Sequence, residues 1–279
     1  MRRRNPPLHL TAAPARPLPR RRPAFGHTVG SEWLKLRSVR STYWTVLATL
    51  VVSVGLSGLL ALAFVTSWDR LPERDRALFD PTSYAMTGTN IGLLVLSVLG
   101  VLTMTSEYST GTIRVSLAAV PDRTRFLAAK VLVLGAVALA VGQVSAFASF
   151  LLGQLFFASR DLDVSLGEPG VLRAVSGCGL YLTLVTLLAF GIGVLLRHTA
   201  AAITTVVGLM FVLPIIAAFL PGERWLAVRR LIPSQAGSAV TVVHPNETYL
   251  APLPGLGVFC CYLAAVLVPA YLLFLRRDA

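Results

Sequence analysis

Long apolar stretches alternate with short charged segments along the chain. Stretches without Asp, Glu, Lys or Arg run over 41–68, 81–106, 131–159, 174–196, 198–222 and 248–275. A helix needs about 20 mainly apolar residues to cross the hydrocarbon core of a bilayer. Trimmed by hydropathy, the stretches predict six transmembrane helices, at roughly 44–66, 87–105, 130–157, 174–196, 200–220 and 255–275. None shows the alternating pattern of a membrane barrel strand. The pattern predicts an all-α polytopic membrane protein.

The composition supports this fold class. Of 279 residues, 55% are hydrophobic and 14% are charged, whereas soluble proteins carry about 25% charged residues. The net charge of +12 does not indicate nucleic-acid binding, because the basic residues flank apolar runs and form no stripe with interleaved aromatics. The three cysteines lie inside apolar runs without metal-binding spacing, so we interpret them as buried hydrophobic residues.

The connecting segments predict the orientation. With both termini in the cytoplasm, the cytoplasmic segments hold 17 Lys and Arg residues and the opposite loops hold 8. Basic residues are enriched in cytoplasmic loops, so we expect both termini inside. Trp44 and Trp68 bracket the first span, as interfacial anchors do.

The N-terminal segment divides into two parts. Residues 1–27 are rich in Arg, Pro and Ala, which predicts a disordered cytoplasmic tail. From residue 28 onward, Val29, Trp33 and Leu36 share one helical face, and Ser31 is a candidate N-cap. We expect an amphipathic helix on the cytoplasmic membrane surface; the alternative is a basic, solvated extension of the first span.

No Asp or Glu lies inside a trimmed span, and Lys130 touches one only at its edge. Because buried ionisable groups usually mark ion and proton pathways, this argues against transport through an intramembrane carboxylate. Gln143 and Gln154 lie 11 positions apart on one side of the third span. They are candidates for hydrogen bonds between helices or for lining a translocation pathway.

Small residues recur every four positions along the first span, at Thr49, Ser53, Ser57 and Ala61. This seam predicts close packing against another helix or against a second subunit. Pro214 and Pro269 are expected to kink the last two spans.

The segment 106–130, between the second and third spans, carries most of the functional information. Glu107 opens it, a turn is expected at 109–111, and an aliphatic run from Ile113 ends at Pro121. Asp122 or Thr124 can cap the next helix. A short helix with aliphatic residues and one arginine beneath the membrane suits docking to a soluble partner.

This segment resembles the membrane subunits of ATP-binding-cassette transporters, in particular the type-2 exporter permeases of actinobacterial type. The resemblance rests on Glu107, Ser109, Gly111, Thr112, Ile113, Arg114, Pro121, Arg123 and Lys130. The stretch SEWLKLRS at 31–38 is similar to the connecting helix of such permeases, and six spans with both termini inside also fit. The resemblance covers about residues 28–279, taken as one permease domain.

The resemblance implies a coupling helix within 107–125 that a separate ATPase subunit grips. The implied coupling residues are Glu107, Gly111, Thr112, Arg114, Pro121 and Arg123. It also implies a second contact at the turn 197–199, short lid helices within 221–254, and a second permease subunit, identical or related. The expected location is the cytoplasmic (inner) membrane of a bacterium.

The chain carries no phosphate-binding G-x-x-x-x-G-K-[ST] motif. We therefore expect it to bind no cofactor or metal, with ATP and Mg²⁺ held by the partner ATPase. One alternative is a gradient-driven carrier or channel without an ATPase. Another is a membrane enzyme or sensory anchor, which the four scattered histidines do not favour. The sequence does not identify the cargo.

Overall fold

The computed structural model describes residues 24–219, 224–243 and 248–276, and within these ranges every regular element is a helix. The helices are α1 Phe25–Ser38, α2 Arg40–Ser67, α3 Glu73–Ala77, α4 Pro81–Ala85, α5 Thr89–Ser109, α6 Thr112–Ala119, α7 Arg123–Phe157, α8 Val171–Leu196, α9 Thr199–Val207, α10 Leu213–Ala218, α11 Arg224–Leu231, α12 Pro233–Ser238 and α13 Pro252–Arg276. Short 3₁₀ turns lie at Trp68–Arg70, Ala158–Arg160 and Ala239–Thr241.

Six helical segments of the described chain are long and apolar enough to cross a membrane, which confirms the predicted all-α polytopic fold. They contain α2, α5, α7, α8, the α9–α10 pair and α13. Some of these helices extend beyond the predicted spans. The clearest case is α7, which begins at Arg123 rather than near Lys130, because Asp122 caps it: its carboxylate accepts hydrogen bonds from the backbone N–H groups of Thr124 and Arg125.

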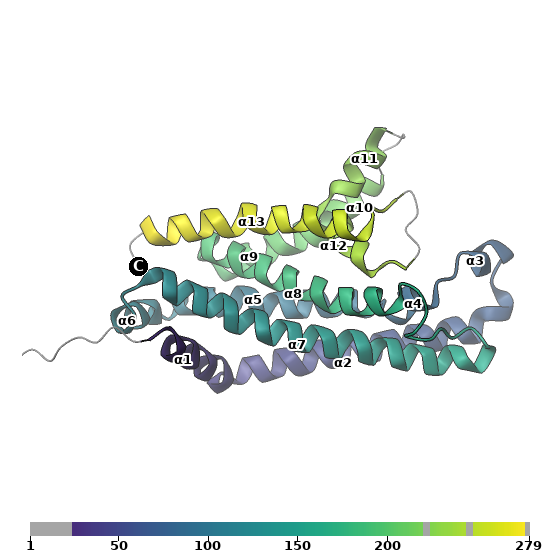
Figure 1. The fold of residues 1–279 in the computed structure, drawn as a ribbon, viewed down its shortest axis with the longest axis horizontal. Coiled ribbons are helices and arrows are strands. Elements are labelled where there is room, and N and C mark those ends of the chain that lie inside the picture. Colours follow the sequence, from purple (N-terminus) through teal and green to yellow (C-terminus); the bar gives the residue numbers. More distant parts are fainter. Residues whose placement is uncertain (1–23, 220–223, 244–247, 277–279) are drawn as a thin grey trace, which may run out of the picture.

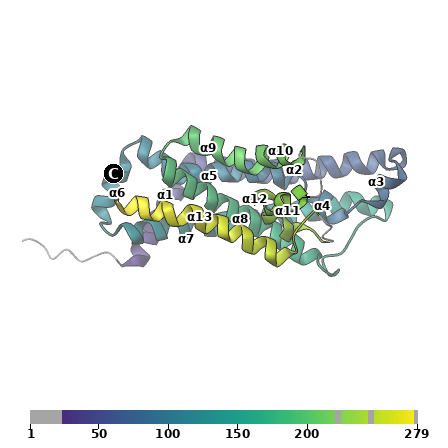
Figure 2. The ribbon, with the colours of Figure 1, turned by 90° about the horizontal axis from the view of Figure 1, so that it is seen from above.

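The long helices run side by side, with α8 at the centre of the bundle (Figures 1 and 2). In an apolar stretch of 18 residues, 72% of α8 is buried inside the chain. In the corresponding 18-residue stretch of α13, 17% is buried. Helix α8 therefore forms the core, and α13 lies at the periphery. Helices α1 and α6 lie at one end of the bundle, with α3, α4 and α12 toward the other (Figure 1).

The predicted small-residue seam of α2 packs inside the chain. Thr49, Ser53, Ser57 and Ala61 are all buried. Ser57 lies against the start of α5, where the backbone N–H of Gly88 donates a 3.0 Å hydrogen bond to its Oγ. Of the two alternatives, packing within the fold is confirmed.

The two prolines differ in their effect. Pro214 is the second residue of α10, which follows a π-helical turn, Gly208–Val212, that separates it from α9. Pro cannot donate to the carbonyl four residues earlier, and a wider π turn accommodates this loss. Pro269 lies inside α13, which continues as one helix to Arg276.

The N-terminal helix differs from its prediction. Helix α1 begins at Phe25, so Ser31 lies in its interior and the prediction of Ser31 as N-cap is wrong. Its buried residues are Thr28 and Glu32, whereas Trp33 is 46% exposed. The polar face of α1 therefore packs on the protein. The predicted tail lies mostly at 1–23, outside the described residues.

Candidate functional site

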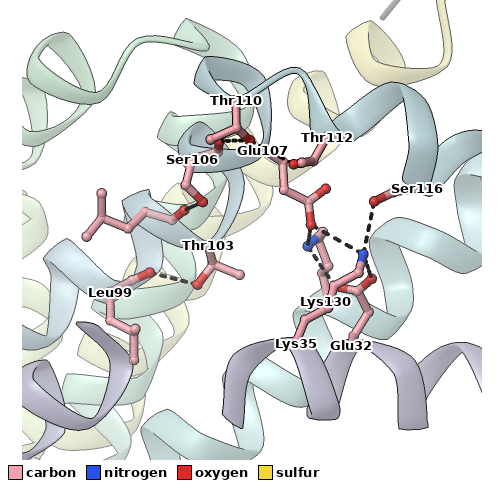
Figure 3. Close-up of polar contacts among 11 residues, drawn as sticks. Glu32, Lys35, Leu99, Thr103, Ser106, Glu107, Thr110, Thr112, Ser116 and Lys130 are labelled. Atoms are coloured by element: carbon pink, nitrogen blue, oxygen red, sulfur yellow. Dashed lines mark hydrogen bonds and ion pairs between the residues drawn. The ribbon is translucent and has the colours of Figure 1, made fainter. Parts of the chain in front are cut away.

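Four charged side chains from three helices meet at the α6 end of the bundle. We call Glu32, Lys35, Glu107 and Lys130 the charge cluster (Figure 3). Helix α1 contributes Glu32 and Lys35, one turn apart; the last turns of α5 contribute Glu107; and α7 contributes Lys130. Two ammonium groups and two carboxylates make the cluster formally neutral.

Lys130 is the centre of the charge cluster. Its Nζ donates to Glu32 Oε2 and to Glu107 Oε1, both at 2.7 Å, and its side chain is 3% exposed. The ring centroid of Phe126 lies 5.0 Å from the same Nζ, within the range of a cation–π contact. A buried ammonium needs such compensation, because its hydration is lost.

Lys35 connects the cluster to α6. Its Nζ lies 2.6 Å from Glu32 Oε1 and donates a 3.0 Å hydrogen bond to Ser116 Oγ of α6. It also lies 3.4 Å from Glu107 Oε1. Helix α6 is thereby linked through one polar network to α1, α5 and α7.

Helix α6 has one anchored side and one exposed side. Ile113 is 3% exposed and packs into the core, whereas Val115 is 72% exposed. Arg114 and Ala118 are also exposed. An exposed aliphatic and basic surface on a short helix is suited to contact another protein.

Turns at both ends of α6 set its position. Gly111 precedes it with φ of +71°, in the left-handed region that glycine adopts without steric cost. Thr112 is its first residue, and its hydroxyl lies 2.9 Å from that of Thr110. Pro121 lies in the short link to α7.

Arg123 takes a different place from the other predicted coupling residues. Its Nη1 donates to the backbone carbonyls of Phe274 and Leu275, at 3.0 and 3.1 Å. These carbonyls end α13 and lack partners within that helix. Phe126 also stacks on Phe274, with ring centroids 6.0 Å apart. The start of α7 therefore ties the last helix to the charge cluster.

The turn between α8 and α9 lies against the end of α5. Thr199 Oγ1 donates to Thr105 Oγ1 at 2.9 Å, and the Arg197 guanidinium lies 4.7 Å from the ring centroid of Tyr108. His198 caps α9, accepting from the backbone N–H of Ala201. This turn is thus joined to the helix that leads into α6.

The two glutamines of α7 make separate hydrogen bonds. Gln143 Nε2 donates to the carbonyl of Ser176 in α8, at 2.9 Å. Gln154 Oε1 accepts from the backbone N–H of Val164, in the segment that links α7 to α8, at 2.9 Å.

The sequence reasoning missed the charge cluster as a unit. It used Glu107 and Lys130 in the family resemblance without pairing them, placed Lys130 at the edge of a span, and assigned Glu32 and Lys35 no role of their own. One feature of the sequence could have indicated the cluster: of its 25 Lys and Arg residues, only Lys35 and Lys130 are lysines. Both lie in the cluster, where a compact ammonium can bind carboxylates from several directions.

The charge cluster joins three helices through ion pairs. Within the described residues, no group of three or more His, Cys, Asp or Glu side chains could hold a metal ion. The cluster holds helices in one arrangement and connects an exposed helix to the bundle.

A comparison with protein families matches residues 28–216 to the family described as ABC-2 family transporter protein. The match covers more than half of the chain, including α6 and all four residues of the charge cluster. A comparison with curated proteins gives no match.

Proposed function

Since this chain belongs to the ABC-2 transporter family and is a multi-pass membrane protein, we propose that it is the permease subunit of an ATP-driven exporter. A separate ATPase subunit binds it at α6. A second permease subunit, identical or related, completes the translocation pathway. ATP and Mg²⁺ belong to the ATPase.

One observation carries the proposal: α6 presents an exposed aliphatic and basic surface and is held from behind by the buried charge cluster. A force applied to α6 passes through Ser116 and Lys35 to Glu107 and Lys130, and so to α5 and α7. In the proposed cycle, closure of the ATPase subunits moves α6, and the helices follow as rigid bodies.

The candidate coupling residues have distinct roles in this proposal. Arg114 and Val115 contact the ATPase, and Glu107 transmits movement into α5. Gly111, Thr112 and Pro121 shape the ends of α6, and Arg123 passes the movement on to α13. The absence of Asp and Glu from the predicted spans argues against the alternative, a gradient-driven carrier.

The test is to purify the chain from membranes of its own host and identify the proteins that co-purify. We expect an ATPase with a phosphate-binding loop. Val115→Glu and Arg114→Glu are expected to reduce its recovery at least tenfold and to abolish ATP-dependent export, because each alters the exposed side of α6.

Leu78→Glu is the matched control, since Leu78 is 70% exposed and lies between α3 and α4, at the opposite end. Normal recovery of the ATPase with both α6 variants would contradict the docking site. Absence of any ATPase would contradict the proposed function.

A further inference from the structure

A cavity of about 500 Å³ lies between α4, α5, α8, the α9–α10 segment and α12. Two of the elements that line it, α4 and α12, lie toward the end of the bundle opposite α6 (Figure 1). Pockets that hold small organic ligands have volumes of about 300–1,000 Å³. Among the described residues that line this cavity, none is Asp, Glu, Lys or Arg.

Most of the cavity wall is apolar. Its apolar lining includes Leu93 of α5 and Leu182 of α8, together with Phe211 and Ile215. Phe211 lies in the π turn that precedes Pro214. Such turns occur often at functional sites, and here the turn places its side chains along the cavity.

Two polar atoms of α12 are buried beside the cavity. Ser234 Oγ and Gln235 Oε1 have no hydrogen-bond partner among the described residues, and both residues line the cavity. A buried polar atom without a partner costs free energy, and native structures contain few of them. Tyr181 donates to the backbone carbonyl of Ser234 at 3.4 Å, so this contact does not satisfy the Ser234 hydroxyl.

We propose that this cavity binds an uncharged amphipathic molecule with a hydroxylated head group. The head group lies against Ser234 and Gln235, and the apolar part lies against Leu93 and Phe211. A hydroxyl both donates and accepts hydrogen bonds, so it satisfies a serine hydroxyl and a glutamine amide together. A charged head group would lose its hydration and meet no opposite charge among the described lining residues. That the bound molecule is exported cargo rests on the proposed function.

The binding test uses three probes with the same ten-carbon tail and a diazirine. The probes are 1-decanoylglycerol, decanoate and decyltrimethylammonium, added to the purified full-length chain in lipid nanodiscs without ATPase. After illumination, labelled peptides are mapped. We expect saturable labelling of peptides from α12 and the π turn by the glycerol probe, competed by unlabelled 1-decanoylglycerol, and at least tenfold less by the charged probes. Equal labelling by all three, or no saturable labelling there, would overturn the proposal.

Two variants separate a binding role from a structural one. Gln235→Leu and Ser234→Ala should each reduce labelling by roughly three- to tenfold, the value of one neutral hydrogen bond. Neither should lower the thermal unfolding midpoint, because Ser234 Oγ and Gln235 Oε1 are buried and have no partner within the described chain. Ser159→Ala, which changes an exposed serine of a 3₁₀ turn, should leave labelling and midpoint unchanged. Unchanged labelling in both variants, or labelling lost together with stability, would refute the assignment.

The assignment as cargo is tested separately. In vesicles containing the chain and its ATPase, ATP should drive export of 1-decanoylglycerol, and Gln235→Leu should reduce it. If the probe binds and is not exported, the cavity is a ligand site that does not serve transport. If no ATPase associates with the chain, the proposed function fails while the binding result stands.

Discussion

Glu32 and Lys130 lie 98 positions apart in the sequence, and their charged groups lie 2.7 Å apart in the buried interior of the α6 end. This ion pair joins a helix that precedes the first span to the third membrane-crossing helix. Through Lys35 and Glu107 it also reaches α6 and α5. One polar network thus sets the position of the helix to which we assign ATPase docking.

Removing Lys130 should strongly destabilise the protein. Lys130→Met leaves two buried carboxylates with only Lys35 nearby, and breaking a buried ion pair from one side costs about 3–5 kcal/mol. The double variant Lys130→Met/Glu32→Gln restores a neutral cluster and should recover part of the loss. Unfolding curves of the purified chain in one detergent measure both. A double variant as unstable as the sum of its single changes would contradict the pairing.

The two lysines should differ in their tolerance of arginine. Lys130→Arg should cost about 1–3 kcal/mol, because a larger planar group must fit a site that is 3% exposed. Lys35→Arg should have little effect on stability, since its side chain is 40% exposed and has room to rearrange. The same unfolding measurement compares them, and equal losses would show that burial does not decide the choice of lysine.

Gly100 should not tolerate a methyl group. A Cβ there would collide with the backbone carbonyl oxygen of Thr186 in α8, so Gly100→Ala should cost about 1–3 kcal/mol. Gly55 of α2 is the matched control, because a Cβ there meets no atom within 4 Å. Gly55→Ala should stabilise the helix by up to about 1 kcal/mol. The two substitutions should change the free energy of unfolding in opposite directions. A decrease in this free energy for both variants would contradict this packing.

Gln143 should contribute a measurable bond between α7 and α8. Gln143→Leu removes the hydrogen bond to the Ser176 carbonyl, and such interhelical bonds in membranes contribute about 0.6 kcal/mol on average and up to about 1.7 kcal/mol. Val144→Ala provides the control on the neighbouring position, which is 55% exposed. Unfolding in the same detergent should show the larger loss for Gln143→Leu.

Local sequence patterns were sufficient to predict those features of the fold that one physical rule determines. Apolar length predicted six spans, because lipid requires each crossing segment to satisfy its own backbone. The four-residue repeat from Thr49 predicted close packing, and Asp122 was correctly named as a candidate cap of α7. These features depend on neighbours along one helix.

Ser31 and the polar face of α1 show where local sequence patterns fail to predict the structure. The apolar residues of this helix were expected to determine what it contacts, yet Glu32 is buried and Trp33 is half-exposed. The reason is that an ion-pair partner on α7 compensates Glu32, and no property of residues 25–38 indicates that partner.

By itself, the sequence determined that this is a membrane protein with six helical spans, and it pointed to the segment 106–130 as the informative one. Only the tertiary structure decided that Glu32, Lys35, Glu107 and Lys130 form one network, and that Ser234 and Gln235 line a cavity whose described lining residues include no Asp, Glu, Lys or Arg. The hydrophobic length of a span depends only on the residues of that segment. Whether a charge is buried, or a polar atom lacks a partner, depends on groups that folding brings together from distant parts of the chain.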